Sequence, residues 1–264
     1  MGARNSGIVD IDGLAVYYET EGSGQPLVLL HGGLSDNSSW APQFAGLSPH
    51  RRVIAPERRA HGHTPDPGGP ITYQAMAKET VGFLRFMDLG PADLVGWSDG
   101  GMVAFLVAVS DPHLVRTITM VGASVSSGGY VARAMDDLTE LPADDDEMAM
   151  FEAMYAAASP DGPAHFPEVW DKVRTLWSEE FDWWDDVATV STPTLVVVGD
   201  DDLISVASAD ELARRLPAGQ LAVIPGASHV APLEKPDLFN QLVLDFTAHP
   251  VVETMMPVRR KASS

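Results

Sequence analysis

Short apolar runs alternate with longer amphipathic stretches along most of this chain of 264 residues. Two runs near the N-terminus, residues 8–11 and 14–18, flank Asp12-Gly13 and predict a β-hairpin. Six later runs predict further strands: residues 27–30, 52–56, 92–95, 117–121, 194–198 and 221–224. The run at residues 27–30 is continuously apolar, which is typical of a parallel strand that is buried on both faces.

Helical periodicity fills most of the gaps between these strands. Residues 73–89 repeat apolar side chains every three to four positions, and Gly90-Pro91 ends that pattern. Further helices are predicted over residues 102–109, over 206–216 with Ser205 as N-cap, and over 235–248 with Pro236 in the first turn. Strands that alternate with helices predict an α/β fold, with a mostly parallel sheet flanked by helices.

The alternation breaks once, between Val121 and Thr192. This stretch is helical in pattern and holds four of the six tryptophans, so we interpret it as a helical cap inserted after the sixth strand. The expected organisation is therefore a core formed by residues 1–123 and 192–249, a cap of residues 124–191, and a mobile tail of residues 250–264.

Charge is distributed unevenly along the chain. The formal net charge is −20, which argues against a nucleic-acid partner. Residues 124–191 contain 16 acidic and three basic residues, so 13 of the 20 excess negative charges lie there. An acidic rim would repel anionic substrates and tolerate neutral or cationic ones. The alternative is a solvated face that keeps the protein in solution.

Amino-acid composition excludes several classes of protein and of functional site. The chain has no cysteine, which excludes a disulfide framework, a thiol nucleophile and a cysteine-ligated metal. No apolar run approaches the roughly 18 residues of a membrane span, and no signal peptide is evident at the N-terminus. We therefore expect a cytoplasmic protein without a membrane partner, a metal or a cofactor. No sequence feature indicates an oligomeric state.

The segment Gly96-Trp97-Ser98-Asp99-Gly100 joins the strand at 92–95 to the helix at 102–109. A Gly-x-Ser-x-Gly between a strand and a helix is the nucleophile elbow. The turn is so tight that its serine adopts a strained backbone, and the flanking glycines leave room for the neighbouring strand and helix. The Ser98 hydroxyl then projects above the sheet, beside the positive end of a helix.

A serine nucleophile needs an imidazole base and a carboxylate that orients the base. Gly199-Asp200-Asp201-Asp202 follows one predicted strand, and a glycine-containing loop with His229 follows the last one. We choose Asp202 as the acid, because it lies far enough along its loop to reach a histidine. Asp200 and Asp201 are the alternatives. For His229 the alternative is a loop histidine bonded to the backbone.

His31-Gly32-Gly33 directly follows the strand at 27–30. The backbone N–H groups of Gly33 and of Asp99 are the candidate donors of an oxyanion hole. Taken alone, this tripeptide is equally consistent with a plain turn from strand to loop.

Five motifs in this order and spacing resemble the α/β-hydrolase superfamily: residues 29–33, 55–64, 96–101, 199–202 and 226–229. The resemblance implies an eight-stranded sheet, a helical cap after the sixth strand and a cofactor-free Ser-His-Asp mechanism. The second motif departs from the usual Asp-x-Arg-Gly-His-Gly-x-Ser at Glu57, Ala60 and Thr64. His61-Gly62-His63 resembles a metal-binding pair, but the motif implies a structural role.

The expected function is that of a serine hydrolase acting on a small-molecule ester or lactone. The elbow is similar to that of valacyclovir hydrolases, a group of amino-acid-ester hydrolases, which implies that Asp99 holds a substrate amine. The alternative is an acidic residue favoured by the helix dipole. Trp97, Trp183 and Trp184 are further substrate-binding candidates, unless they only pack the cap on the sheet.

Two other functions stay open. One is a ligand-binding or receptor protein of the same fold with little turnover. The other is a C–C hydrolase or perhydrolase, which the resemblance makes less favourable because Asp99 stands where those enzymes usually have methionine.

Overall fold

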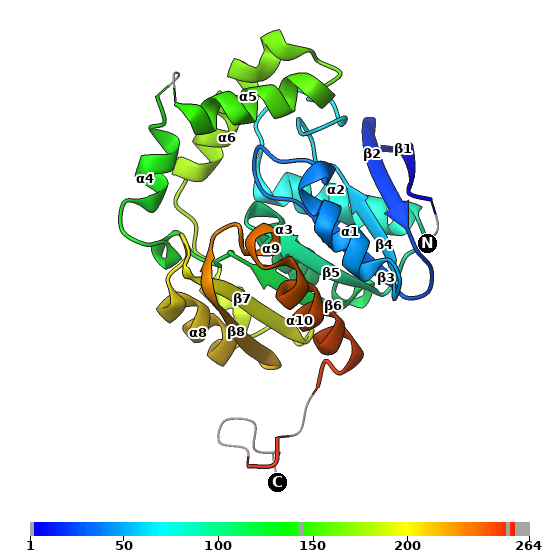
Figure 1. Ribbon diagram of the computed structural model, residues 1–264, viewed down its shortest axis with the longest axis vertical. Helices are drawn as coiled ribbons and strands as arrows, with labels where there is room; N and C mark the ends of the chain where they lie inside the picture. The colour runs from blue at the N-terminus through cyan, green and yellow to red at the C-terminus, as the bar shows by residue number, and fades with distance from the viewer. Residues whose placement is uncertain (1–2, 143–144, 252–253, 257–264) are drawn as a thin grey trace.

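The computed structural model describes residues 3–142, 145–251 and 254–256, and within them eight strands form one sheet (Figure 1). The strand order is β1-β2-β4-β3-β5-β6-β7-β8. The pairs β1–β2 and β2–β4 are antiparallel and every other pair is parallel, which confirms the predicted fold class. The strands are β1 (Asn5–Ile11), β2 (Leu14–Glu21), β3 (Pro26–Leu30), β4 (Arg52–Pro56), β5 (Ala92–Trp97), β6 (Val115–Val121), β7 (Thr194–Asp201) and β8 (Gly219–Ser228).

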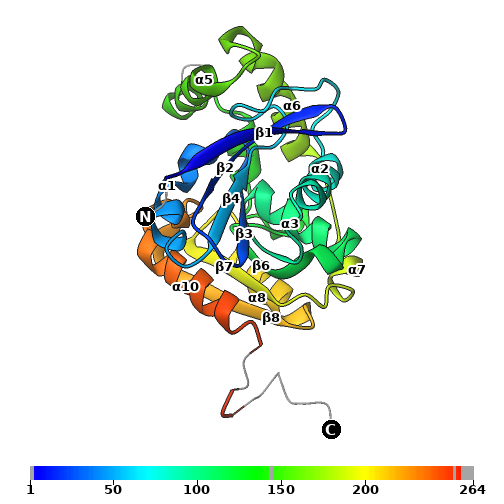
Figure 2. The same cartoon turned by 90° about the vertical axis from the view of Figure 1, so that its right-hand side faces the viewer.

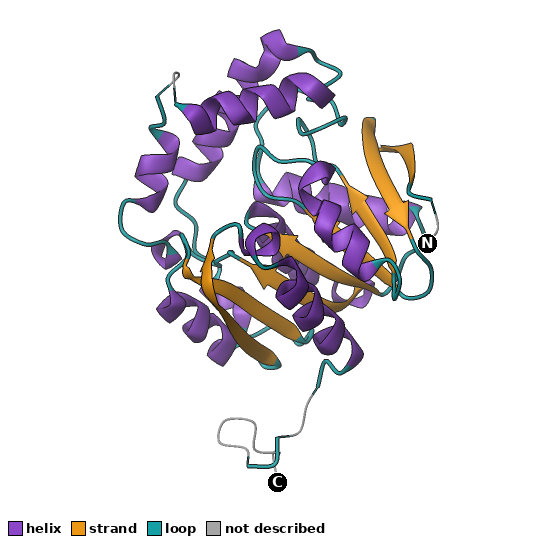
Figure 3. Cartoon of the chain, viewed as in Figure 1, coloured by secondary structure: helices purple, strands orange, loops and turns teal. Residues whose placement is uncertain are grey.

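The continuously apolar strand β3 is explained by helices on both faces of the sheet (Figure 3). In β3, Leu27 and Leu29 join the core on one face, whereas Val28 and Leu30 join the core on the other. All four are fully buried, because successive side chains of a strand point to opposite faces. Figures 1 and 2 show α1 (Ala41–Leu47) and α10 (Pro236–Ala248) on one side, and α2 (Tyr73–Phe86), α3 (Asp99–Ser110) and α8 (Val206–Arg215) on the other.

The predicted helices are present with small shifts at their ends. The helix α2 begins at the predicted Tyr73, with Thr72 capping it, and ends three residues early at Phe86. The helix α8 has Ser205 as its N-cap, as predicted, and the Ser205 side chain accepts a hydrogen bond from the N–H of Ser208. The helix α1 was not predicted, because seven residues span too few turns to display a clear period.

The residues between β6 and β7 are helical. Figures 1 and 2 show α5 at one end of the molecule, with α6 beside it. We call residues 124–191 the cap region; its exact boundaries stay a prediction. Its helices are α4 (Ala134–Thr139), α5 (Asp146–Ala158), α6 (Phe166–Ser178) and α7 (Trp184–Val187), and α9 (Ala231–Glu234) precedes α10 in the core.

The predicted mobile tail, residues 250–264, lies largely outside the described residues. Among the helices that are described, none combines the length and the apolar character that a bilayer crossing requires.

Candidate active site

Ser98 occupies the sharp turn between β5 and α3. Its backbone has φ 54° and ψ −125°, a strained conformation for a residue with a side chain. Its N–H donates to the carbonyl of Val121 at 2.8 Å. A Cβ atom placed on Gly100 would lie 2.0 Å from the carbonyl oxygen of Leu30, and one on Gly96 would lie 2.2 Å from that of Gly100. The elbow therefore has the tight geometry that the motif predicts, and it needs both glycines.

His229 and Asp202 meet although 27 residues separate them in sequence. Nδ1 of His229 lies 2.8 Å from Oδ1 of Asp202, and the Asp202 side chain is fully buried. The same carboxylate accepts from the backbone N–H groups of Gly199 and Ile204, each at 3.2 Å. Because Nδ1 is engaged by the carboxylate, Nε2 is the imidazole nitrogen available to a serine.

The two rival carboxylates, Asp200 and Asp201, differ from Asp202 in their exposure to solvent. Asp200 is exposed, and its Oδ1 accepts from the N–H groups of Gly226 and Ala227 at 2.7 and 3.2 Å, which fastens the loop before His229. Asp201 is exposed at the end of β7. Of the three, Asp202 is the one that faces His229.

The end of β6 brings the serine and the histidine to the same edge of the sheet. Ser98 is anchored to Val121, and a Cβ atom on the next residue, Gly122, would lie 2.8 Å from Nδ1 of His229. Gly122 also has φ 58°. Glycine is therefore favoured there both by the closeness of His229 and by the left-handed backbone. Ser98 is half-buried, so part of it stays exposed to solvent. A nucleophile must keep this access to substrate.

The loop after β3 lies against the elbow. A Cβ atom on Gly32 would lie 3.5 Å from Cβ of Ser98, and one on Gly33 would lie 2.6 Å from Oδ2 of Asp99. Gly33 and Asp99, the candidate oxyanion donors, are therefore neighbours next to the serine.

The Asp99 side chain has partners that the sequence did not reveal. It is 3% exposed, and Oδ1 accepts from the hydroxyl of Tyr73 at 2.9 Å. Nε1 of Trp177, from α6 of the cap region, lies 3.2 and 3.1 Å from the two carboxylate oxygens. Burial raises the pKa of the Tyr73 hydroxyl, and the charge of Asp99 raises it further, so this hydroxyl stays a donor.

The other candidate substrate-binding residues, three tryptophans, lie in different places. Trp97 is 7% exposed, packs edge-on against Trp40 and donates from Nε1 to the carbonyl of His229 at 2.7 Å. Trp183 is stacked on Phe105. Trp184 lies under the guanidinium of Arg215, 4.5 Å from the ring centre. Trp97 thus supports the histidine loop from within the core, and the substrate-binding roles stay predictions.

The motif at residues 57–64 forms a tightly bonded loop. Ala60 has φ 60°, the left-handed region where the family usually has glycine, and the loop keeps its turn despite the substitution. The buried Glu57 accepts from the N–H groups of Asn37 and His63, and burial raises its pKa to about 7. Nδ1 of His61 faces the carbonyl of Arg59, whereas the ring of His63 stacks on Tyr17. The two histidines therefore have separate partners.

One group of side chains within the described residues is close enough to hold a metal: Asp66, His165 and Glu168. Nζ of Lys172 lies 2.8 Å from Oε1 of Glu168 and also pairs with Asp66. An ammonium group therefore already provides positive charge at this cluster, which joins the loop after β4 to α6.

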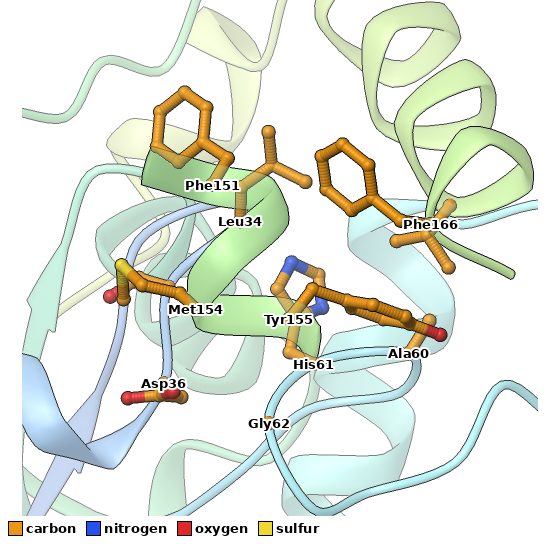
Figure 4. A pocket seen from close by; sticks show the side chains of 11 residues that line it. Leu34, Asp36, Ala60, His61, Gly62, Phe151, Met154, Tyr155 and Phe166 are labelled. Atoms are coloured by element: carbon orange, nitrogen blue, oxygen red, sulfur yellow. The ribbon is translucent and has the colours of Figure 1, made fainter. Parts of the chain in front are cut away.

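A small pocket opens one residue beyond Gly33, between the core and the cap region (Figure 4). Its floor is formed by residues 34–36 and 60–62. Its other wall is apolar and comes from α5 and α6, with Phe151, Met154 and Phe166 (Figure 4).

The chain matches the family model described as "Alpha/beta hydrolase family" over residues 27–242. It is 30% identical to 2-hydroxy-6-oxo-2,4-heptadienoate hydrolase from Pseudomonas putida, over 86% of this chain and 90% of that enzyme. Two solved structures are each 25% identical. A serine hydrolase involved in carbazole degradation has a TM-score of 0.79 and covers 93% of this chain and 99% of its own. Est816, an N-acyl homoserine lactone degrading enzyme, has a TM-score of 0.70, and the match covers 91% of this chain and 100% of the Est816 chain.

The sheet order, the elbow and these similarities agree over most of the chain. This protein therefore belongs to the alpha/beta hydrolase family of enzymes.

Proposed function

We propose that this protein is a serine hydrolase that cleaves a carboxylic ester or a lactone through an acyl-enzyme. The observation that carries the proposal is the contact of 2.8 Å between Nδ1 of His229 and Oδ1 of the buried Asp202, beside an elbow serine. A buried carboxylate that holds one imidazole nitrogen leaves the other to accept the serine proton.

In the proposed mechanism, Ser98 Oγ attacks the substrate carbonyl while Nε2 of His229 takes its proton. The negative charge that develops on the carbonyl oxygen is stabilised by the N–H groups of Gly33 and Asp99, each worth roughly 3 kcal/mol. His229 then protonates the leaving group. It next activates a water molecule, which releases the acyl group from Ser98.

The substrate we propose is neutral or cationic and at least partly hydrophobic. The apolar side chains of Phe151, Met154 and Phe166 line a pocket with Leu34, the residue after Gly33, which supports a hydrophobic group. The acidic cap region supports the exclusion of anions. The lactone option is supported by the 25% identity to an enzyme that degrades N-acyl homoserine lactones.

The test is a panel of short-chain p-nitrophenyl esters, lactones and thioesters, run on the wild type and on Ser98→Ala. We expect hydrolysis by the wild type and loss of at least about a thousandfold in the variant. A surface variant, Ser110→Ala, is the matched control. Hydrolysis that persists in Ser98→Ala contradicts the proposal. Rapid labelling of Ser98 by a fluorophosphonate without turnover of any substrate favours a binding or receptor protein.

A second candidate is carbon–carbon bond hydrolysis by the same three residues. It is favoured by the 30% identity to a 2-hydroxy-6-oxo-2,4-heptadienoate hydrolase. The dienoate in that enzyme's name is an anion. The acidic cap region would repel an anionic substrate, which disfavours this candidate. Turnover of this dienoate faster than any ester in the panel would make carbon–carbon hydrolysis the better proposal.

A further inference from the structure

Arg58 takes no part in the mechanism above, yet its guanidinium is buried behind the loop that carries Gly33. The residue is 4% exposed. Nη2 donates to the carbonyl oxygens of His31 at 2.6 Å and Gly32 at 2.8 Å. The backbone N–H of Arg58 also donates to Nε2 of His31 at 3.1 Å. Both the main chain and the side chain of Arg58 therefore hold residues 31–32.

The carbonyl of Gly32 and the N–H of Gly33 belong to one peptide unit. In the described part of the chain the cis peptide bond is at Gly90-Pro91, so the Gly32–Gly33 unit is trans. In a planar trans unit the N–H points opposite to the carbonyl. A guanidinium that holds the carbonyl of Gly32 therefore aims the N–H of Gly33 away from Arg58.

His31 provides a second donor to the same carbonyl. Because Nε2 of His31 accepts from the N–H of Arg58, the proton of the neutral ring is on Nδ1. Nδ1 lies 2.8 Å from the carbonyl oxygen of Gly32 and donates to it. Burial lowers the pKa of His31 well below its ordinary value, so the ring stays neutral. Two donors thus fix the direction of one peptide.

A buried guanidinium needs a nearby negative charge. The carboxylate of Asp99 provides it, since its charge opposes the lowering of the Arg58 pKa by burial. Tyr73 and Trp177 hold that carboxylate by hydrogen bonds. The N–H of Asp99 is the other candidate oxyanion donor. Arg58 is thus bonded to the peptide of one donor and electrostatically coupled to the residue of the other.

We propose that Arg58 is a positioning residue for the oxyanion hole: its guanidinium orients the Gly32–Gly33 peptide so that the N–H of Gly33 faces the substrate oxygen. This rests on the proposed function, because an oxyanion forms only where Ser98 attacks a carbonyl. In the family motif Asp-x-Arg-Gly, Arg58 occupies the variable position, so the motif assigns it no role. Lysine cannot replace it fully, because it lacks the planar, delocalised fork of donors.

The test compares Arg58→Lys with Arg59→Lys. Arg59 is a matched control, because within the described residues its guanidinium bonds to Glu79 at 3.0 Å and to the carbonyl of Pro70 at 3.2 Å, and not to residues 31–33. Three quantities are measured: kcat and KM for an ester that the wild type hydrolyses, Ki for a trifluoromethyl ketone that forms an oxyanion adduct, and the rate at which a fluorophosphonate labels Ser98.

In Arg58→Lys we expect kcat and the labelling rate to fall at least about tenfold while KM changes less than about twofold. Ki for the ketone rises in proportion to the loss in kcat/KM. Arg59→Lys stays within about twofold of the wild type in all three quantities.

Equal behaviour of the two variants overturns the proposal, as does a loss confined to KM. Circular dichroism checks the fold of both. An Arg58→Lys protein that does not fold, beside a folded Arg59→Lys, also overturns it, because a purely structural role then suffices. The labelling rate is measured without a substrate. The inference therefore fails, and the proposed function stands, if Ser98→Ala abolishes hydrolysis while Arg58→Lys behaves like Arg59→Lys. The proposed function fails by itself if no substrate is turned over while Arg58→Lys still slows the labelling of Ser98.

Discussion

The indole N–H of Trp97 donates to the backbone carbonyl of His229 at 2.7 Å, so the residue before the elbow serine holds the loop that carries the candidate base. Without this bond the His229 loop is held less firmly, so the imidazole is placed less accurately relative to Ser98. We predict that Trp97→Phe lowers kcat about three- to tenfold and destabilises the protein by about 1 kcal/mol beyond the loss of ring volume.

Trp40→Phe is the matched control for Trp97→Phe. Trp40 packs against Trp97 and is fully buried, but its Nε1 has no hydrogen-bond partner in the described chain. The two variants remove the same atoms from the same core, and only one removes a hydrogen bond to the histidine loop. Urea unfolding and kcat are measured for both. If the two variants lose equal activity, the bond to His229 has no positioning role.

The identity of the catalytic acid is tested by Asp202→Asn and Asp201→Asn. An asparagine at position 202 is neutral and cannot stabilise the imidazolium that forms when His229 accepts the serine proton. We expect kcat to fall about 10⁴-fold in this variant. Asp201 is exposed at the end of β7, whereas Asp202 is the carboxylate bonded to His229, so Asp201→Asn is expected to stay within about twofold of the wild type. The opposite ranking of the two variants would assign the acid to Asp201.

Much of this site could be predicted from sequence because of where parallel strands end. The carboxyl ends of β3, β5, β6, β7 and β8 meet at one edge, so motifs that follow those strands converge there. Ser98, Gly33, Asp202 and His229 each directly follow a strand or lie in the loop after one.

The partners around Asp99 could not be predicted in this way. The Trp177 bond to Asp99 spans 78 residues, and the Tyr73 bond spans 26. Both depend on how α6 and α2 pack over the elbow, and helical periodicity alone does not determine that packing. Trp97 was open to prediction from strand alternation, because it points to the same face as Val95 and therefore into the core.

The glycines of the elbow give a prediction about stability. In Gly100→Ala the new Cβ would lie 2.0 Å from the carbonyl oxygen of Leu30, so β3 or α3 must shift. We expect a loss of at least about 3 kcal/mol, or no folded protein at all. In Gly128→Ala the Cβ would lie 3.5 Å from Oγ of Ser126, an ordinary contact, and stability is expected to change by less than about 1 kcal/mol. Similar melting temperatures for the two variants would contradict the tight elbow.

The amine-binding role of Asp99 is tested by comparing aminoacyl esters with their N-acetyl counterparts. Both Asp99 oxygens already accept hydrogen bonds, and the residue is 3% exposed. We therefore expect the ratio of kcat/KM between the two substrates to lie within about threefold of one. We also expect Asp99→Asn to leave this ratio unchanged. A preference of more than about tenfold for the free amine that Asp99→Asn abolishes would instead establish the amine site.

Two buried histidines predict a loss of stability in acid. Burial lowers the pKa of His61 to about 3, with a further contribution from Arg58, and the pKa of His31 is lowered as well. The unfolded chain binds protons at these positions near pH 6.5, whereas the folded chain does not bind one at His61 until about pH 3. The unfolded state therefore binds more protons in this window, and the free energy of unfolding falls as the pH falls.

Each such histidine lowers the free energy of unfolding by up to about 1.4 kcal/mol for each pH unit of acidification. Glu57 acts in the opposite direction, because its pKa of about 7 gives the folded state an extra proton below that pH. Comparing His61→Gln with the wild type isolates the contribution of His61, since His31 and Glu57 are present in both. We expect the wild type to lose up to about 2 kcal/mol more than the variant between pH 7.5 and pH 5, measured by urea unfolding. Parallel losses in the two proteins would show that His61 already takes up its proton in the folded state near pH 6.5.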